Sequence, residues 1–358
     1  MPSVKVMKRD LSAFLDLTRT LAALTVFLAH LSKPQFGGAP LSVFGELSHS
    51  AVIVFFVLSG FVISWAAERD GGAREYVLNR ASRIYSVALP ALALTWVTDN
   101  FLILHYPGTI ALIYQYEAVW KYLPLFLTFS SDFWFLSEDA FSNIPYWSLC
   151  YEVWYYVVFG ALIFGRGFWR WGIAIACLLV MGPRLWLLWP IWLAGAYLHR
   201  LRPLPRGASR RLLLFSLTGL VALKASGVED FLNSVVDQVT GGFATVHLRY
   251  SQFFLGDYLV AILIAGAIHA ARGADLAFLA ALRKPIAAAA SISFSMYLLH
   301  YPLFFFFGAL FPRQMFTIGL LTLSVIIVFG ITFERHRALL KGILAALWPP
   351  KDQVPAYR

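Results

Sequence analysis

The chain has 358 residues, of which 59% are hydrophobic and only 13% are charged. A soluble globular protein carries roughly 25% charged residues, so this composition excludes a disordered protein and an ordinary soluble enzyme and favours a polytopic membrane protein. The net charge is +10, but the basic residues lie mainly between apolar stretches, as membrane topology requires, and we therefore expect no nucleic-acid partner.

Ten apolar stretches predict an all-α polytopic membrane protein built as one bundle, because about 20 apolar residues span the hydrocarbon core. The fifth and sixth stretches are separated only by residues 182–184 and predict either a tight hairpin or one kinked helix. The segment 115–130 is interrupted by Lys121 and Pro124, which predicts an interfacial or re-entrant piece. The ten stretches are 13–32, 47–66, 86–104, 146–165, 171–183, 185–198, 212–226, 253–271, 287–309 and 314–333.

Charge predicts the orientation of the bundle. With both termini in the cytoplasm, most of the 29 Lys and Arg residues fall in the inner connections, as the positive-inside rule requires. The sequence shows no tandem repeat and no linker, so we expect residues 1–358 to form a single membrane domain without a fused soluble domain.

The first span carries three ionisable residues, Asp16, Arg19 and His30. Eleven positions separate Arg19 from His30, which places them within about 20° of one helix face and about 16 Å apart along the axis. Ionisable residues at membrane depth are usually functional or paired. Asp16 can pair with Arg19 at the i,i+3 spacing, and His30 is then either a functional imidazole or an interfacial residue.

The second span contains Ser59-Gly60, a small-residue pair that permits close approach of another backbone or of a ligand. We expect Ser59 to serve helix packing. In the connection that follows, Arg80 and Arg83 are three residues apart, and on a helical turn they point the same way. Paired guanidinium groups suit phosphate oxygens, and the alternative is an anchor at the lipid headgroups.

Two later spans carry one ionisable residue each. Glu152 has no cation in its own helix, so it either pairs with His30 or an arginine on another helix, or is protonated and bonded to a backbone carbonyl. His300 lies in an apolar helix two residues before Pro302, which frees the carbonyl near position 298. His300 either orients a ligand or bonds that carbonyl.

Metal and disulfide chemistry are not indicated. Cys150 and Cys177 lie inside apolar runs, and no metal-ligand spacing is present, so we expect neither a metal nor a disulfide. Inner arginines together with buried histidines and a carboxylate instead suggest an anionic cytosolic cofactor and a proton transfer within the membrane.

These segments, taken in order along nearly the whole chain, resemble the acyltransferase family 3 membrane proteins. The stretch LDLTRTLAALTVFLAH fits the family's Arg-x10-His, with Arg19 and His30. The stretches FFVLSGFVIS, with Ser59, and RASR, with Arg80 and Arg83, match its second-helix and R-x-x-R motifs. The last two matches are YWSLCYEVWYY, with Trp147 and Glu152, and SFSMYLLHYPL, with Tyr297 and His300.

The resemblance implies an integral-membrane O-acyltransferase of the bacterial inner membrane. Such enzymes move a short acyl group, typically acetyl, from acyl-CoA to a sugar, polysaccharide or glycosylated acceptor. We hypothesise that Arg19, Arg80 and Arg83 hold the CoA phosphates or the polarised end of the donor. His30 is then the general base, or forms a covalent acyl-histidine, and Glu152 orients His30 or stabilises its imidazolium. The rival interpretations are a transporter or flippase of a glycan or small anion, and a non-catalytic sensor.

The small residues of 261–290 also suit packing between subunits of a homo-oligomer.

Overall fold

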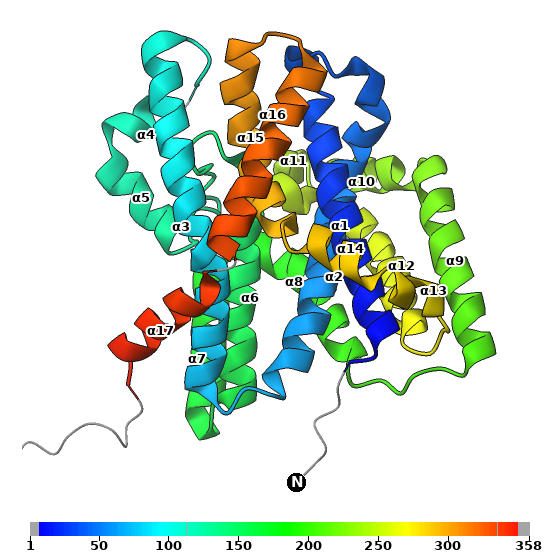
Figure 1. Ribbon diagram of the computed structural model, residues 1–358. Coiled ribbons are helices and arrows are strands. Elements are labelled where there is room, and N and C mark those ends of the chain that lie inside the picture. The colour runs from blue at the N-terminus through cyan, green and yellow to red at the C-terminus, as the bar shows by residue number, and fades with distance from the viewer. Residues whose placement is uncertain (1–6, 112, 335, 350–358) are drawn as a thin grey trace, which may run out of the picture.

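The computed structural model describes residues 7–111, 113–334 and 336–349, and in these ranges every long regular element is a helix (Figure 1). Short 3₁₀ turns lie before α2, α6 and α12, and a π-helical turn at Gly330–Glu334 precedes α17. The α-helices are α1 (Arg9–Leu31), α2 (Ser48–Ala67), α3 (Ala73–His105), α4 (Ile113–Glu117), α5 (Val119–Leu127), α6 (Trp147–Phe164), α7 (Gly167–Met181), α8 (Pro183–Leu198), α9 (Arg206–Ala225), α10 (Val228–Val239), α11 (Phe243–His247), α12 (Phe254–Ala271), α13 (Ala277–Ala281), α14 (Arg283–Ala290), α15 (Ser293–Leu310), α16 (Met315–Phe329) and α17 (Arg337–Leu347).

Seven helical segments in the described part of the chain are long and apolar enough to cross a membrane, and an eighth arises if α9 and α10, bent by 60°, form one span. The all-helical membrane fold is therefore confirmed, but the count of ten is not. The difference comes from length, because α7 has 15 residues and α8 has 16. The spanning segments are Arg9–Leu31, Ala39–Ala67, Ala73–His105, Ile144–Phe164, Arg249–Ala271, Ser293–Leu310 and Met315–Phe333.

Local chain breaks explain where the elements depart from the sequence pattern. The chain divides α7 from α8 at Gly182, whose φ is +80°, and a Cβ there would lie 2.7 Å from the Cα of Trp134. The segment 115–130 forms the short helices α4 and α5, neither long enough to span. The connection that carries Arg80 and Arg83 is not a loop, because α3 begins at Ala73 and runs for 33 residues.

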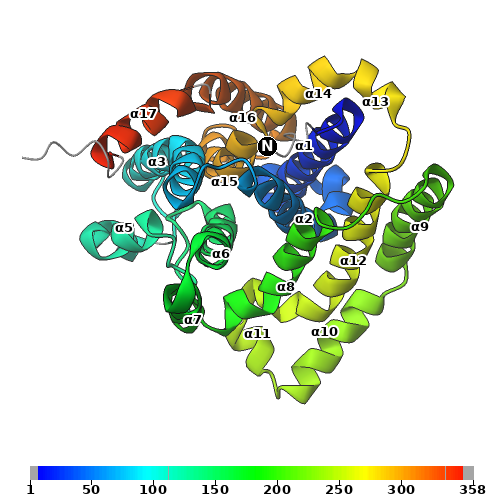
Figure 2. The same ribbon diagram turned by 90° about the horizontal axis from the view of Figure 1, so that it is seen from below.

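Helix α2 lies in the middle of the bundle, beside α1, α8 and α12 (Figure 2). Its contact with α8 is unusually close. A Cβ on Gly60 would lie 2.0 Å from the Trp192 carbonyl oxygen, and a Cβ on Gly195 would lie 2.0 Å from the Val57 carbonyl oxygen. The small-residue pair Ser59-Gly60 therefore permits the backbone approach that the sequence predicts.

A buried ionic cluster fixes the segment between α5 and α6. Arg249 donates to Asp132 at 3.0 Å and also to Asp139, while Arg184 lies 3.8 Å from Asp132. The Asp132 side chain is fully buried. Burial raises the pKa of this carboxyl group to about 6, against the opposing effect of Arg249. The charged form of Asp132 is therefore disfavoured in the folded protein even though two guanidinium groups face it.

Candidate active site

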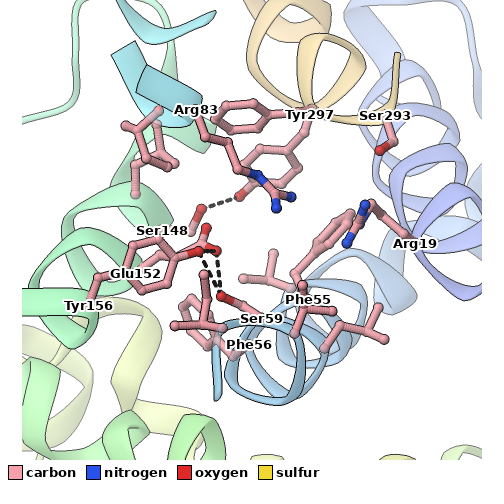
Figure 3. A pocket seen from close by; sticks show the side chains of 17 residues that line it. Arg19, Phe55, Phe56, Ser59, Arg83, Ser148, Glu152, Tyr156, Ser293 and Tyr297 are labelled. Atoms are coloured by element: carbon pink, nitrogen blue, oxygen red, sulfur yellow. Dashed lines mark hydrogen bonds between the residues drawn. The ribbon is translucent and has the colours of Figure 1, made fainter. Parts of the chain in front are cut away.

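A cavity of about 710 Å³ lies among α1, α2, α3, α6 and α15. Five of the ionisable and polar residues that line it are Arg19, Ser59, Arg83, Glu152 and Tyr297, one from each of these helices (Figure 3). The remaining wall is largely apolar. Side chains distant in sequence thus meet around one cavity, which is the usual form of a small-molecule site.

Glu152 is held by hydroxyl groups rather than by a histidine. Its Oε1 accepts a hydrogen bond of 2.6 Å from Ser59 Oγ and another from the Tyr156 hydroxyl. Trp192 Nε1 in turn donates to Ser59 Oγ at 3.2 Å. Ser59 thus does more than pack, because it fixes the carboxylate. None of the hydrogen bonds of Glu152 among the described residues goes to His30, which the sequence offered as a partner.

Two guanidinium groups point into the cavity opposite Glu152 (Figure 3). Arg19 makes the predicted i,i+3 contact with Asp16, but at 3.9 Å this is a loose ion pair. Within the described residues, no carboxylate lies at ion-pair distance from Arg83. Both groups therefore keep most of their hydrogen-bonding capacity for an anion in the cavity.

Arg80 has a different environment from Arg83. It pairs with Asp70 at 2.8 Å, its guanidinium lies over the Tyr76 ring, and it does not line the cavity. Positions three apart on a helix differ by about 60° in direction. On α3 this difference is enough to turn Arg83 toward the bundle and Arg80 toward the α2–α3 connection.

A second cavity, of about 660 Å³, shares Arg19, Arg83, Ser293 and Phe294 with the first. The two cavities therefore adjoin each other at these four residues. The second also has Arg337 of α17 in its lining. Sequence reasoning treated Arg337 only as one of many inner-side charges, because nothing in its neighbours marks it.

The two predicted histidines meet farther along the bundle. His30 Nδ1 and His300 Nε2 are 2.7 Å apart, and their rings are nearly parallel. His300 Nδ1 lies 2.9 Å from the Met296 carbonyl oxygen. The ring of Tyr301 packs edge-on against His30, and its hydroxyl accepts a 2.5 Å hydrogen bond from Lys33. Neither histidine belongs to the lining of the 710 Å³ cavity.

Pro302 frees a backbone carbonyl of its helix, as the sequence predicts, but the group that bonds this carbonyl was not predicted. The Leu298 carbonyl, which a proline four residues later cannot bond, accepts a hydrogen bond from Asn143 Nδ2 at 2.8 Å. His300 therefore does not serve that carbonyl. Asn143 was not singled out from the sequence, because nothing there shows that it lies next to α15.

Tyr297 and Trp147 have different surroundings, and only Tyr297 lines the cavity. The Tyr297 hydroxyl is 2.8 Å from Ser148 Oγ, and its ring is 6.3 Å from that of His300. Trp147 stacks on Tyr250 with ring centroids 4.1 Å apart. Tyr297 therefore lies between the cavity and the histidine pair, and Trp147 serves aromatic packing beside it.

A family model described as an acyltransferase domain, Acyl_transf_3, matches residues 12–333. Since this covers most of the chain, the protein belongs to the acyltransferase family 3. In the described part of the chain, no group of three or more His, Cys, Asp or Glu residues is placed to hold a metal ion.

Two curated proteins are similar over shorter stretches. One is "Acyltransferase MdmB" of Streptomyces mycarofaciens, 37% identical over 76 residues, which are 20% of each chain. The other is "O-acetyl transferase" of Shigella phage Sf6, 32% identical over 94 residues, which are 24% of this chain and 28% of the phage protein. The matches thus span less than a third of either relative. No solved structure matches the chain.

Proposed function

We propose that the protein is a membrane-embedded O-acyltransferase of the bacterial inner membrane, which moves an acetyl or other short acyl group from acyl-CoA to a hydroxyl group of a sugar, polysaccharide or glycosylated acceptor. The observation that carries the proposal is that two arginines line a cavity that reaches Tyr297, whose ring contacts the histidine pair. Arg19 and Arg83 face a cavity without a neutralising carboxylate at Arg83, and the His30–His300 pair lies beyond it. Family membership and the relative called an O-acetyl transferase support the reaction class.

The hydrogen bonds of His300 make His30 a suitable general base. A carbonyl oxygen only accepts, so His300 Nδ1 carries the proton that bonds Met296. In a neutral His300 the Nε2 atom then carries a lone pair and accepts a hydrogen bond. His30 Nδ1, 2.7 Å away, is therefore the donor of this hydrogen bond. A neutral His30 consequently carries its lone pair on Nε2, where it can take a proton from an acceptor hydroxyl.

The proposed reaction is a direct acyl transfer. His30 Nε2 removes the proton of the acceptor hydroxyl, and the oxygen attacks the thioester carbonyl carbon. The C–S bond breaks, the thiolate of CoA receives the proton from the His30 imidazolium, and the products are an O-acyl ester and free CoA. The Tyr301 hydroxyl, which accepts from Lys33 and keeps its own proton to donate, stabilises the oxyanion that forms at the thioester.

The donor enters from the inner side in this proposal. Arg19 and Arg83 bind phosphate oxygens of CoA, and the pantetheine arm occupies the largely apolar 710 Å³ cavity. Glu152, which the sequence assigned to orienting His30, instead provides the charge that faces Arg19 across the cavity, held there by Ser59 and Tyr156. Tyr297 moves aside when the thioester reaches His30.

The test is release of free thiol from acetyl-CoA by the purified protein and by its His30→Ala variant, together with binding of labelled CoA to both. The proposal expects both proteins to bind CoA and only the natural chain to turn over. Failure of the natural chain to bind CoA would overturn the proposal and favour a transporter.

A further inference from the structure

We propose that Arg337, on the C-terminal helix, binds the 3′-phosphate of the donor's CoA and so selects CoA over donors that lack this group. The inference rests on the proposed acyl-CoA-dependent function and goes further, because it assigns a residue and a subsite to the nucleotide end of the donor. The sequence motifs that carry the family resemblance do not include this residue.

The chemistry of the 660 Å³ cavity suits a phosphorylated ligand. Three guanidinium groups line it, those of Arg19, Arg83 and Arg337, and no carboxylate does. Three serines, Ser86, Ser291 and Ser293, lie in the same wall, but their hydroxyls donate to backbone carbonyls, so the arginines are the groups that would bind an anion. Guanidinium groups are the usual side-chain partners of phosphate oxygens. Three cations that line one cavity, with only the loose Asp16 pair of Arg19 and the nearby Asp70 to offset them, repel one another less once an anion enters.

The order of the three arginines matches the order of groups along CoA. Arg19 and Arg83 line both cavities, so they mark the junction between them. Arg337 lines only the cavity on the far side of that junction from Glu152. With the pantetheine arm beside Glu152 and the diphosphate at the junction, the next charged group of CoA is the 3′-phosphate of the adenosine, and this group reaches Arg337.

The surroundings of Arg337 favour an anion as its partner. Arg337 is the first residue of α17, where the helix dipole disfavours a cation and favours an anion. Its neighbours include Arg83 and Arg80, with Asp70 as the acidic group nearby, and burial together with these two arginines lowers its pKa. One Nη2 hydrogen bond, 2.9 Å to the Asn79 carbonyl oxygen, fixes the side chain and leaves its other N–H groups for a ligand.

Helix α17 is itself held against α3, which keeps Arg337 in place (Figure 1). Arg74 of α3 donates to the carbonyl oxygens of Ala345 at 2.9 Å and Trp348 at 2.6 Å, near the other end of α17. The helix is therefore anchored at both ends, through Asn79 and through Arg74. An arginine on a helix fixed in this way is preorganised to bind a ligand.

The experiment compares CoA with 3′-dephospho-CoA, which differs from it only in the proposed group. Affinity of the purified full-length protein for each compound is measured by calorimetry for the natural chain and for Arg337→Ala, Arg337→Lys and Lys341→Ala. Lys341 lies one turn farther along α17 near Glu75, outside the cavity lining, and is the matched control. The detergent is free of phospholipid in one series and supplemented with phosphatidylglycerol in the other.

The expected result is a natural chain that prefers CoA, and an Arg337→Ala variant that loses about tenfold or more in CoA affinity, as for a hydrogen bond to a charged group, with unchanged affinity for 3′-dephospho-CoA. Arg337→Lys should keep part of the preference, and Lys341→Ala all of it. The inference would be overturned if Arg337→Ala lowered the affinity for both compounds equally or for neither. An effect of Arg337→Ala seen only with added phospholipid would also overturn it. A natural chain that binds the two compounds equally would overturn it while leaving the proposed function intact, whereas one that binds neither would refute the function itself.

Discussion

His30 and His300 are 270 residues apart in the chain, yet their ring nitrogens are joined by a 2.7 Å hydrogen bond across the contact between α1 and α15. The bond to Met296 from the other side of His300 makes this contact directional. His300 therefore orients His30 and accepts part of the charge that develops when His30 takes a proton. In the proposed mechanism His30 touches the reacting atoms, and His300 is a positioning residue.

This arrangement predicts unequal and non-additive losses when the two histidines are replaced. His30→Ala should lower the rate of acyl transfer by about 10²–10⁴-fold, the usual contribution of a general base. His300→Ala should cost less and should shift the pH profile of the rate, because it removes only the partner of the base. The double variant should be no slower than His30→Ala. Rates that multiply in the double variant would show that the two residues act independently.

The two arginines of the R-x-x-R motif should respond differently. Arg83→Ala should raise the KM for acyl-CoA about tenfold, as expected when a hydrogen bond to a charged ligand is lost, and leave kcat nearly unchanged. Arg80→Ala should lower the thermal stability in detergent, because it leaves the buried Asp70 without its partner. Each variant is the control for the other. Equal effects on KM would contradict the assignment of Arg80 to a structural role.

Tyr301 should affect catalysis rather than donor binding. Tyr301→Phe keeps the ring that packs against His30 and removes only the hydroxyl that accepts from Lys33. We expect kcat to fall about 10–100-fold, less than the loss of a side-chain oxyanion donor in a well-studied protease, with the affinity for CoA unchanged. A measurement of single-turnover rates would isolate this step, and an unchanged rate would remove Tyr301 from the mechanism.

The close contact between α2 and α8 predicts a steric effect. Gly195→Ala places a methyl group 2.0 Å from the Val57 carbonyl oxygen, so the helices must separate. Overpacking of this kind costs about 1–3 kcal/mol, and separation also weakens the Trp192–Ser59 hydrogen bond that supports Glu152. Both stability and activity should therefore fall. Gly207→Ala, where a Cβ meets nothing within 4 Å, is the control and should be neutral or slightly stabilising.

The raised pKa of Asp132 should make the free energy of unfolding depend on pH. Burial raises its pKa in the folded protein to about 6, whereas the pKa of an unfolded Asp is about 3.9. Between these values the folded state holds a proton that the unfolded state has lost, so a rise in pH through this window lowers stability, by roughly 3 kcal/mol at most. Above about pH 6 the loss is complete.

The variant Asp132→Asn has no such proton to lose. The difference in melting temperature between the natural chain and this variant should therefore decline from pH 4 to pH 6.5 and then stay constant. Asp139, whose pKa burial also raises, is present in both proteins, so its titration is largely removed in the difference. A difference that does not change with pH would show that Asp132 is ionised throughout.

Helix positions could be predicted from the sequence because hydropathy and length are local properties. Each of the ten apolar stretches contains a helix in the structure, and the errors concern length and connection. The polar residues 73–85 suggested a loop, but they extend α3, because a helix that emerges from the membrane can continue while its polar side chains contact Asp70 and α17. Hydropathy reports the environment of a residue and not its backbone conformation.

The site could be predicted in its residue types but not in its contacts. Arg19, Ser59, Glu152 and Tyr297 do share a cavity. The partner of Glu152, the separation of Arg80 from Arg83 and the contribution of Arg337 depend on which helices are neighbours. One sequence carries no information about neighbouring helices, and so Asn143, Tyr156, Trp192 and Tyr301 could not be found from it.

The position of Tyr297 has a consequence for the cell as well as for the reaction. Its ring, held by the hydrogen bond to Ser148, lies between the cavity and His300, and Phe27 and Phe304 also pack around His300. An open polar path through a membrane protein would pass protons or sodium ions, and this leakage would dissipate the electrochemical gradient across the membrane. In the proposed mechanism, the aromatic layer at Tyr297 therefore lets the donor cavity and the histidine pair lie next to each other without an open polar path between them.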